Sequence, residues 1–281
     1  MSEAIQRTHT FNALAKVLEG DLRLPMVQKI PTQAHALLDA EGGYRAQHTT
    51  GYRLEGILSF SAGHSQVAGH RSTKPGQGWT TLVTTVIEDL NVLEVLTADR
   101  VVGQIITEHP LVGYVPSISF LGTRFENLRI AGHPVNLDLD LEILGPRAED
   151  DSPYTTNPGL IGRVGRQYDG IGDHNDLPAD LSERYNRLSS TLGSPEAVEC
   201  SLVNGASGGY PGKSFGHVID IPDFGKITLA KLTVQHEDFK HDTSASKTTT
   251  VRLTMVDLKL GCVISGGGGL GNGSSNGRTV P

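Results

Sequence analysis

The sequence predicts a mainly β fold, an antiparallel sandwich or barrel-like domain with an inserted loop-plus-helix segment. Three observations support this: 34 glycines against only 5% aromatic residues, several short stretches of alternating apolar and polar residues, and Gly, Pro, Asn and Asp between them. The chain has 281 residues, of which 37% are hydrophobic. It is long enough to bury a sizeable core as one large domain or two small ones.

The clearest alternation lies in the stretch PVNLDLDLEIL. Successive side chains of a strand point to opposite faces, so this pattern predicts a strand with one dry face and one acidic face. The apolar positions are Val135, Leu137, Leu139, Leu141 and Ile143, and the polar ones are Asn136, Asp138, Asp140 and Glu142.

A second long strand is predicted in TTTVRLTMVDLKLG. Val251, Leu253 and Met255 share one parity, whereas the apolar residues from Val256 onward take the other. The change of phase between Met255 and Val256 predicts a β-bulge, because one extra residue restores the apolar face. The expected partner strand is GKITLAKLTVQ, residues 225–235. Further strands are expected at 54–61, 80–87, 93–97, 101–107, 117–121 and 125–130.

One helix is predicted in DLPADLSERYNRLSSTLG, with Asp176 as its N-cap and Gly193 at its end. Its apolar stripe at helical spacing consists of Leu177, Leu181, Tyr185, Leu188 and Leu192. Shorter helices are expected in THTFNALAKVLEG and PTQAHALLDAEGG.

Composition divides the chain into five segments. These are an N-terminal segment (1–50) with the short helices, the first half of the β domain (51–144), a polar loop-and-helix insertion (145–195), the second half of the β domain (196–265) and a Gly-rich C-terminal tail (266–281). The tail has the composition of a flexible linker. Ordering it costs entropy, so an ordered tail needs packing within its own subunit or against a neighbouring one.

Charge and hydropathy limit the partners. The net charge is −7 and Lys and Arg form no cluster, so we expect no nucleic-acid partner. No stretch is long and apolar enough to span a membrane, and the N-terminus lacks the pattern of a secretory signal. A cytoplasmic location is expected, with signal-independent export as an alternative. Cys200 and Cys262 are expected to be buried free thiols, although a bridge between them stays open.

The stretch VNGASGGYPGKSFGH combines the spacing of a serine nucleophile elbow at Ser207 with the end of a phosphate-binding loop. Both motifs need a helix directly after them, and the residues after Ser207 cannot begin one. The spacing of the phosphate loop is also wrong by one residue. The stretch therefore predicts a glycine-rich turn.

The stretch DGIGDHND resembles part of a thrombospondin type 3 calcium repeat. The resemblance implies oxygen ligands for calcium from Asp169, Asp173, Asn175 and Asp180. The acidic residues that should precede Asp169 are absent. A tight turn before a helix capped by Asp176 is the favoured interpretation, and the metal site is the alternative.

Histidines suggest a second metal-site hypothesis. His64, His70 and His133 each follow a glycine, and the even spacing of the first two places them on one face of an extended strand. A transition-metal site could combine them with the acidic strand face or with His236, Glu237 and His241. The acidic face could alternatively carry out general acid–base chemistry, or be a solvated strand surface.

Two functions from different classes follow from these patterns. The first is a non-catalytic structural or binding protein that self-associates through edge-strand pairing or tail exchange, so that the expected partner is a second copy of the chain. The alternative is a metal- or carboxylate-dependent hydrolase that uses the Gly-His turns and the acidic strand. The first hypothesis needs no cofactor, whereas the second needs calcium or a transition metal.

Overall fold

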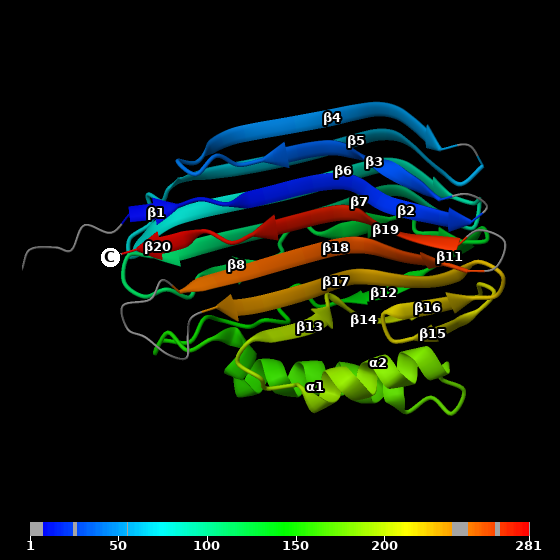
Figure 1. The fold of residues 1–281 in the computed structure, drawn as a ribbon. Coiled ribbons are helices and arrows are strands. Elements are labelled where there is room, and N and C mark those ends of the chain that lie inside the picture. The colour runs from blue at the N-terminus through cyan, green and yellow to red at the C-terminus, as the bar shows by residue number, and fades with distance from the viewer. Residues whose placement is uncertain (1–7, 25–26, 55, 238–246, 262–264, 281) are drawn as a thin grey trace, which may run out of the picture.

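The computed structural model describes residues 8–24, 27–54, 56–237, 247–261 and 265–280. Two large antiparallel sheets face each other across one hydrophobic core, with two helices beneath them (Figure 1). The predicted mainly β, sandwich-like fold is confirmed. Both sheets end in edge strands, so neither closes into a barrel. No helix among the described residues has the length and apolar character needed to cross a membrane.

The first sheet has ten strands. Its main path runs in the order β15 (Lys213–Phe215), β16 (Val218–Ile221), β17 (Gly225–Glu237), β18 (Thr248–Leu260), β19 (Ser265–Ser275), β2 (Ala13–Leu24) and β3 (Gln28–Leu37). Three short strands join it beside this path: β1 (Thr8–Thr10), β13 (Ala197–Ser201) and β20 (Arg278–Val280).

The second sheet has eight strands built from long hairpins. Its order is β11 (His133–Pro134), β10 (Arg129–Ile130), β7 (Leu96–Pro110), β6 (Gln77–Val92), β5 (Leu58–Arg71) and β4 (Gly43–Leu54), with β8 (Ser117–Ser119) and β9 (Arg124–Glu126) beside β7. Strands β12 (Asn136–Leu139) and β14 (Val203–Ser207) form a separate pair.

The short helices expected near the N-terminus are wrong, because these segments form β2 and β3. Their buried residues alternate with period two: Ala13, Ala15 and Val17 in β2, and Ala34 and Ala36 in β3. Alanine favours helices in isolation, but burial of one strand face against the core decides the outcome here.

The change of phase at Met255 and Val256 is confirmed, since both side chains are fully buried. Its cause differs from a single inserted residue. Val256 lies opposite Leu229 and Thr254 opposite Lys231, so the register is unchanged across the flip. The neighbouring strands β2 and β19 change phase at the same level. In β2, Val17 and Leu18 are both buried, and in β19, Gly271 has a φ of +65°. The ten-stranded sheet therefore carries a crease that runs across several strands.

The crease packs into glycine positions of the opposite sheet. A Cβ at Gly63 would lie 2.7 Å from Cγ1 of Val17, and a Cβ at Gly103 would lie 2.8 Å from Cγ of Met255. Both distances are shorter than real Cβ contacts allow. Only glycine lets the two sheets approach this closely.

The predicted acidic strand is shorter than expected. Only Asn136–Leu139 forms a strand, β12, and the chain turns directly after it. The side chain of Asp140 accepts a hydrogen bond of 3.0 Å from the backbone N–H of Glu142. Such a local bond favours a turn over a ladder, so Asp140 and Glu142 lie outside the strand.

The insertion contains a 3-10 turn (Tyr154–Thr156) and two helices, α1 (Pro158–Gly172) and α2 (Ala179–Ser190). Helix α2 was predicted, and Leu181 and Tyr185 of its stripe are buried. The proposed cap is wrong: Pro178 precedes the helix without a side-chain cap, and Asp176 pairs with Lys213. Helix α1 was missed because its five glycines argue against a helix.

Helix α1 covers the free edge of β13. The side-chain amide of Gln167 donates to the carbonyl oxygen of Ser201 at 2.9 Å and accepts from its N–H at 3.2 Å. The hydroxyl of Tyr168 donates to the carbonyl oxygen of Glu199. Side chains of the helix thus take the place of a further strand.

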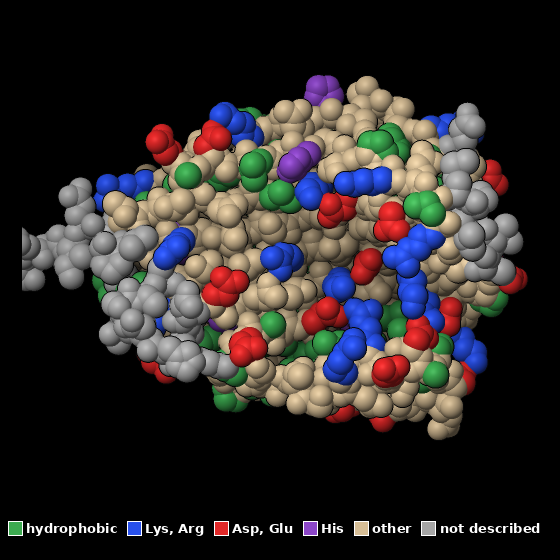
Figure 2. All heavy atoms as spheres, in the orientation of Figure 1, with side chains coloured by type: hydrophobic (Ala, Val, Ile, Leu, Met, Phe, Trp, Pro, Cys, Tyr) green, Lys and Arg blue, Asp and Glu red, His purple; other side chains and the backbone are tan. Residues whose placement is uncertain are grey.

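The Gly-rich tail is an integral part of the ten-stranded sheet. Strand β19 pairs with β18 on one side and with β2 on the other, and β20 pairs with β1. Backbone hydrogen bonds order it on both sides, which the composition of a linker does not reveal. Figure 2 shows acidic and basic side chains interspersed over this face of the molecule, with backbone and uncharged side chains between them.

Substituting Gly63 or Gly103 by Ala should lower the free energy of unfolding by about 1–3 kcal/mol each, because the added methyl forces the sheets apart. Urea unfolding measures the change. Gly205→Ala is the control, since no atom lies within 4 Å of its Cβ position. If Gly63→Ala and Gly103→Ala are as stable as the control, the two sheets do not approach each other closely at these glycines.

Gln167→Leu should destabilise the protein by about 2 kcal/mol or more, because it leaves the N–H and C=O of Ser201 buried without a partner. The exposed Arg166 on the same helix provides the control Arg166→Ala, which should change stability by less than about 0.5 kcal/mol. Thermal and urea unfolding distinguish the two. A neutral Gln167→Leu would show that α1 is not needed to cover β13.

Candidate functional site

Strand β4 is the open edge of the eight-stranded sheet. It pairs with β5 along its length and has no strand on its other side (Figure 1). Its residues from Gly43 through His48 are exposed whichever face they point to, and Tyr44 is 58% exposed. An edge strand presents backbone N–H and C=O groups that have no partner within the sheet. β4 offers such groups over 12 residues.

The other edge strands that the structure describes are short, interrupted or covered. β15 has three residues, β11 has two and ends at Pro134, and β13 is covered by α1. β3 is long, but it contains Pro31, which has no N–H, and its register shifts beside Gly20. β4 has no proline, and its pairing with β5 shows no register shift.

The middle of β4 is uncharged. Residues 46–52 read AQHTTGY, and Arg45 on one side of them pairs with Asp39. The ring of His48 stacks on that of His64 of β5, with 6.2 Å between centroids. A second strand laid along this stretch would meet polar, neutral side chains and no row of like charges. Sequence reasoning missed β4, because a strand exposed on both faces shows no apolar alternation.

The residues of the calcium hypothesis do not converge. Asp169 lies in α1, Asp173 is its C-cap, and both line a small cleft between α1 and α2. Asn175 lies in the connection between the helices. Asp180 lies in the first turn of α2 and pairs with Lys226 at 2.7 Å and with Lys259 at 3.2 Å. These two lysines already neutralise the charge of the carboxylate that a calcium ion would need as a ligand.

The histidines of the transition-metal hypothesis are also apart. His64 and His70 are both exposed on one face of β5, as their spacing predicts. His133 lies in β11, and β10, β7 and β6 separate it from β5. Among the residues that the structure describes, no group of three or more His, Cys, Asp and Glu is placed to hold a metal.

The remaining candidates that the structure describes lie on different strands. Asp138 is exposed in β12, whereas His236 is buried in β17, and Glu237 ends that strand. His241 and Cys262 lie outside the described residues, and Cys200 is a buried free thiol.

The glycine-rich stretch around Ser207 forms two short strands joined by residues 208–212, and not only a turn. Ser207 ends β14 opposite Asn136, and strand β15 follows instead of a helix. The backbone geometry of a nucleophile elbow or a phosphate loop is therefore not present at Ser207.

One end of the core contains a histidine pair that sequence reasoning missed, the half-buried His9 and the buried His109. The ring of His9 lies 4.6 Å from that of His109 and stacks on Trp79 at 5.0 Å between centroids. His109 is 2% exposed, and neither of its ring nitrogens makes a hydrogen bond of good geometry. Burial lowers the pKa of His9 to about 4 and that of His109 to about 3. A hundred residues separate the two positions, so no local motif indicates the pair.

A family model described as a domain of unknown function, DUF8256, matches residues 9–235. The chain belongs to this family. The matched range begins in β1 and ends within β17, so β18 and β19 lie beyond it although they complete the same sheet. The comparisons with curated proteins and with solved structures found no match to the chain.

Among the described residues, four histidines have a pKa lowered by burial: His9, which is half-buried, and His109, His217 and His236, which are buried. Burial lowers the pKa of His217 and His236 to about 4, as it lowers those of His9 and His109. In His236, Nε2 accepts from the N–H of Tyr154 at 3.1 Å, and Nδ1 contacts the hydroxyl of Thr249 at 3.0 Å. A second proton on this ring would face the Tyr154 N–H and break that hydrogen bond.

The stability of the protein should therefore fall in mild acid. Because the pKa values in the folded state lie below the unfolded value of about 6.5, the histidine contribution is complete above that pH and is lost toward pH 4. The free energy of unfolding should fall by up to about 1.4 kcal/mol per pH unit for each histidine. Urea unfolding between pH 8 and 4.5 measures this slope, and His236→Asn should reduce it. A stability independent of pH in this range would contradict neutral burial.

Proposed function

We propose that this protein is a structural or binding protein that self-associates by antiparallel pairing of β4 with β4 of a second copy. The proposal rests on the difference between β4 and the other edge strands of the two sheets. Of the strands described, β4 alone is a long edge without proline, register shift or covering helix. Natural sheets avoid such edges unless a partner uses them.

Pairing between copies would give the free backbone groups of β4 the partners they lack. Two copies related by a two-fold axis present the same strand to each other in opposite directions, which is the arrangement of an antiparallel ladder. The uncharged middle of β4 suits such self-pairing, because no like charges meet there. The result would be one sheet continuous across two subunits.

Edge pairing is favoured over exchange of the C-terminal tail. β19 is a central strand between β18 and β2, so moving it to a second copy would open the sheet in its middle. β4 can pair with a neighbour without breaking any existing ladder. The hydrolase alternative gains no support, because its candidate residues lie on separate elements.

The proposal predicts an oligomer that depends on β4. Light scattering on a size-exclusion column should give twice the chain mass of 30.0 kDa at high concentration and the chain mass on dilution. The double variant Gln47→Lys with Thr49→Lys should stay monomeric, because it places lysines of two copies near each other.

The matched control is His35→Lys on β3, an exposed position on the edge that Pro31 already interrupts. It should associate like the wild-type protein. Circular dichroism should show that the wild-type protein, the double variant and the control all keep the fold. A wild-type protein that stays monomeric at every concentration, or a double variant that still dimerises, would overturn the proposal.

A further inference from the structure

One end of the sandwich has a frame of turns tied together by backbone hydrogen bonds. The N–H of Leu93 donates to the carbonyl oxygen of Ile57 at 2.8 Å, which joins the β6–β7 turn to the β4–β5 turn. The N–H of Ala131 donates to Val95 at 2.7 Å, and that of Gly261 donates to Phe224 at 3.1 Å. These bonds hold the walls of two adjoining hollows.

The first hollow is an apolar groove of about 390 Å³, lined among others by Leu93, Val95, Ile221, Pro222 and Phe224. This volume lies within the range of about 300–1,000 Å³ that is typical of small-molecule sites. The groove therefore has the size and lining to take a hydrocarbon chain.

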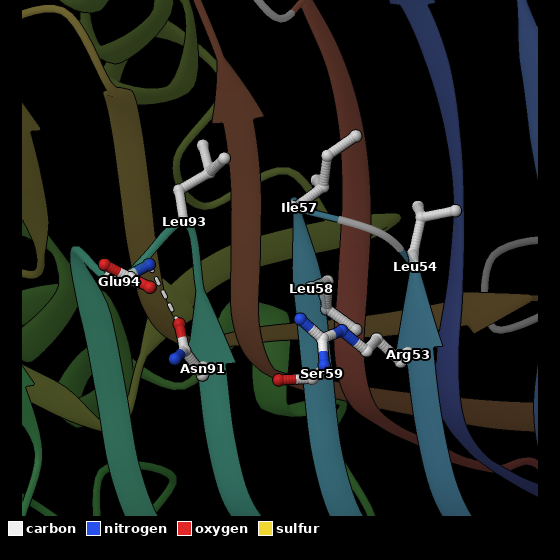
Figure 3. Close-up of a pocket in the computed structure, with 9 residues that line it drawn as sticks. Arg53, Leu54, Ile57, Leu58, Ser59, Asn91, Leu93 and Glu94 are labelled. Carbon is white, nitrogen blue, oxygen red and sulfur yellow. Dashed lines mark hydrogen bonds between the residues drawn. The ribbon is translucent and has the colours of Figure 1, made fainter.

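The second hollow is a polar recess of about 70 Å³ that shares Leu93 with the groove. Figure 3 shows the guanidinium of Arg53 extending across β5, over Ser59, toward the side of Asn91. The oxygen Oδ1 of Asn91 accepts from the N–H of Glu94 at 2.8 Å. Its amide nitrogen is then left as a donor, and Arg53, Ser59 and Asn91 lie in register across β4, β5 and β6. Arg53 forms no ion pair with any described residue, so the recess is rich in donors.

The turn between the two hollows is strained. Leu93 and Glu94 have φ values of +55° and +57°, and the N–H of Val95 donates to the carbonyl oxygen of Val92 at 3.0 Å. A turn of this kind favours Asn-Gly, whereas Leu and Glu are costly in left-handed backbone. Strain of this kind is concentrated at functional sites. Here it places the Leu93 side chain at the boundary of groove and recess.

We propose that this end of the sandwich binds an amphipathic small molecule, an apolar chain with a carboxylate head. The chain lies in the groove along Leu93, Val95 and Phe224. The carboxylate accepts hydrogen bonds from Arg53, Asn91 and Ser59, because a guanidinium matches carboxylate geometry in a bidentate manner. Glu94, on the rim of the recess, weakens this binding through its like charge.

Isothermal titration of the full chain with decanoate tests the proposal, with decanol as the probe without a charge. Decanoate should bind at one site, and decanol about tenfold or more weaker. Arg53→Gln should weaken decanoate by a similar factor and leave decanol unchanged. Arg71→Gln, at the opposite end of β5, is the matched control and should bind like the wild-type protein.

Two variants of the turn sharpen the test. Leu93→Asn suits the left-handed backbone, so it should keep or raise the melting temperature while decanoate and decanol binding are lost. Glu94→Gln should tighten decanoate binding by removing the like charge. The proposal is wrong if decanoate fails to bind the wild-type chain, or if Leu93→Asn binds it normally. Equal decanoate affinity of Arg53→Gln and the wild-type protein would overturn the assignment of the carboxylate to Arg53.

Discussion

The unpaired backbone groups at the edges of two large sheets are the constraint on which most of this structure depends. Each edge N–H and C=O must meet water, a side chain or another strand. The insertion supplies Gln167 and Tyr168 to the edge of β13, and Pro31 interrupts β3. The remaining edges are short except β4. The proposal of self-association follows from this one exception and not from a catalytic or binding motif.

The interior depends on a second constraint, the fit between a crease and two glycines. Val17 and Met255 are fully buried where the ten-stranded sheet changes phase, and they pack against Gly63 and Gly103. The Gly-rich β19 takes part in the same crease through Gly271. The residues that give the tail its linker composition therefore serve close packing in the middle of the sheet.

Alternation of apolar residues predicted the fold class, the phase change at Met255 and the pairing of β17 with β18, because one-sided burial leaves a period of two. The same signal failed where neither face of a strand is buried, and where a turn interrupts the alternation. β4 is exposed on both faces, and the Asp140 turn interrupts a perfect alternation. Helix α1 was hidden by glycines whose cost is offset by burial of Leu160 and Val164 against the core.

The side-chain clusters found in the structure were harder to predict, because they depend on contacts between distant segments. His9 contacts His109, and Arg53 and Asn91 come to line one recess, only after the hairpins are assembled. The strain at Leu93 and Glu94 cannot be detected in a sequence that lacks the Asn-Gly signal. In contrast, Asp169, His64 and His133 were noticed because they form local patterns, and the fold places them on separate elements.

Hydrogen exchange of the β4 backbone tests the central claim most directly, because it reports on the edge itself. At high protein concentration, the amides of Gly43–Leu54 that point away from β5 should exchange about tenfold or more slowly than at high dilution. The amides of β3 should exchange at the same rate in both samples. Exchange of β4 that is independent of concentration would show that this edge faces water and not a second copy.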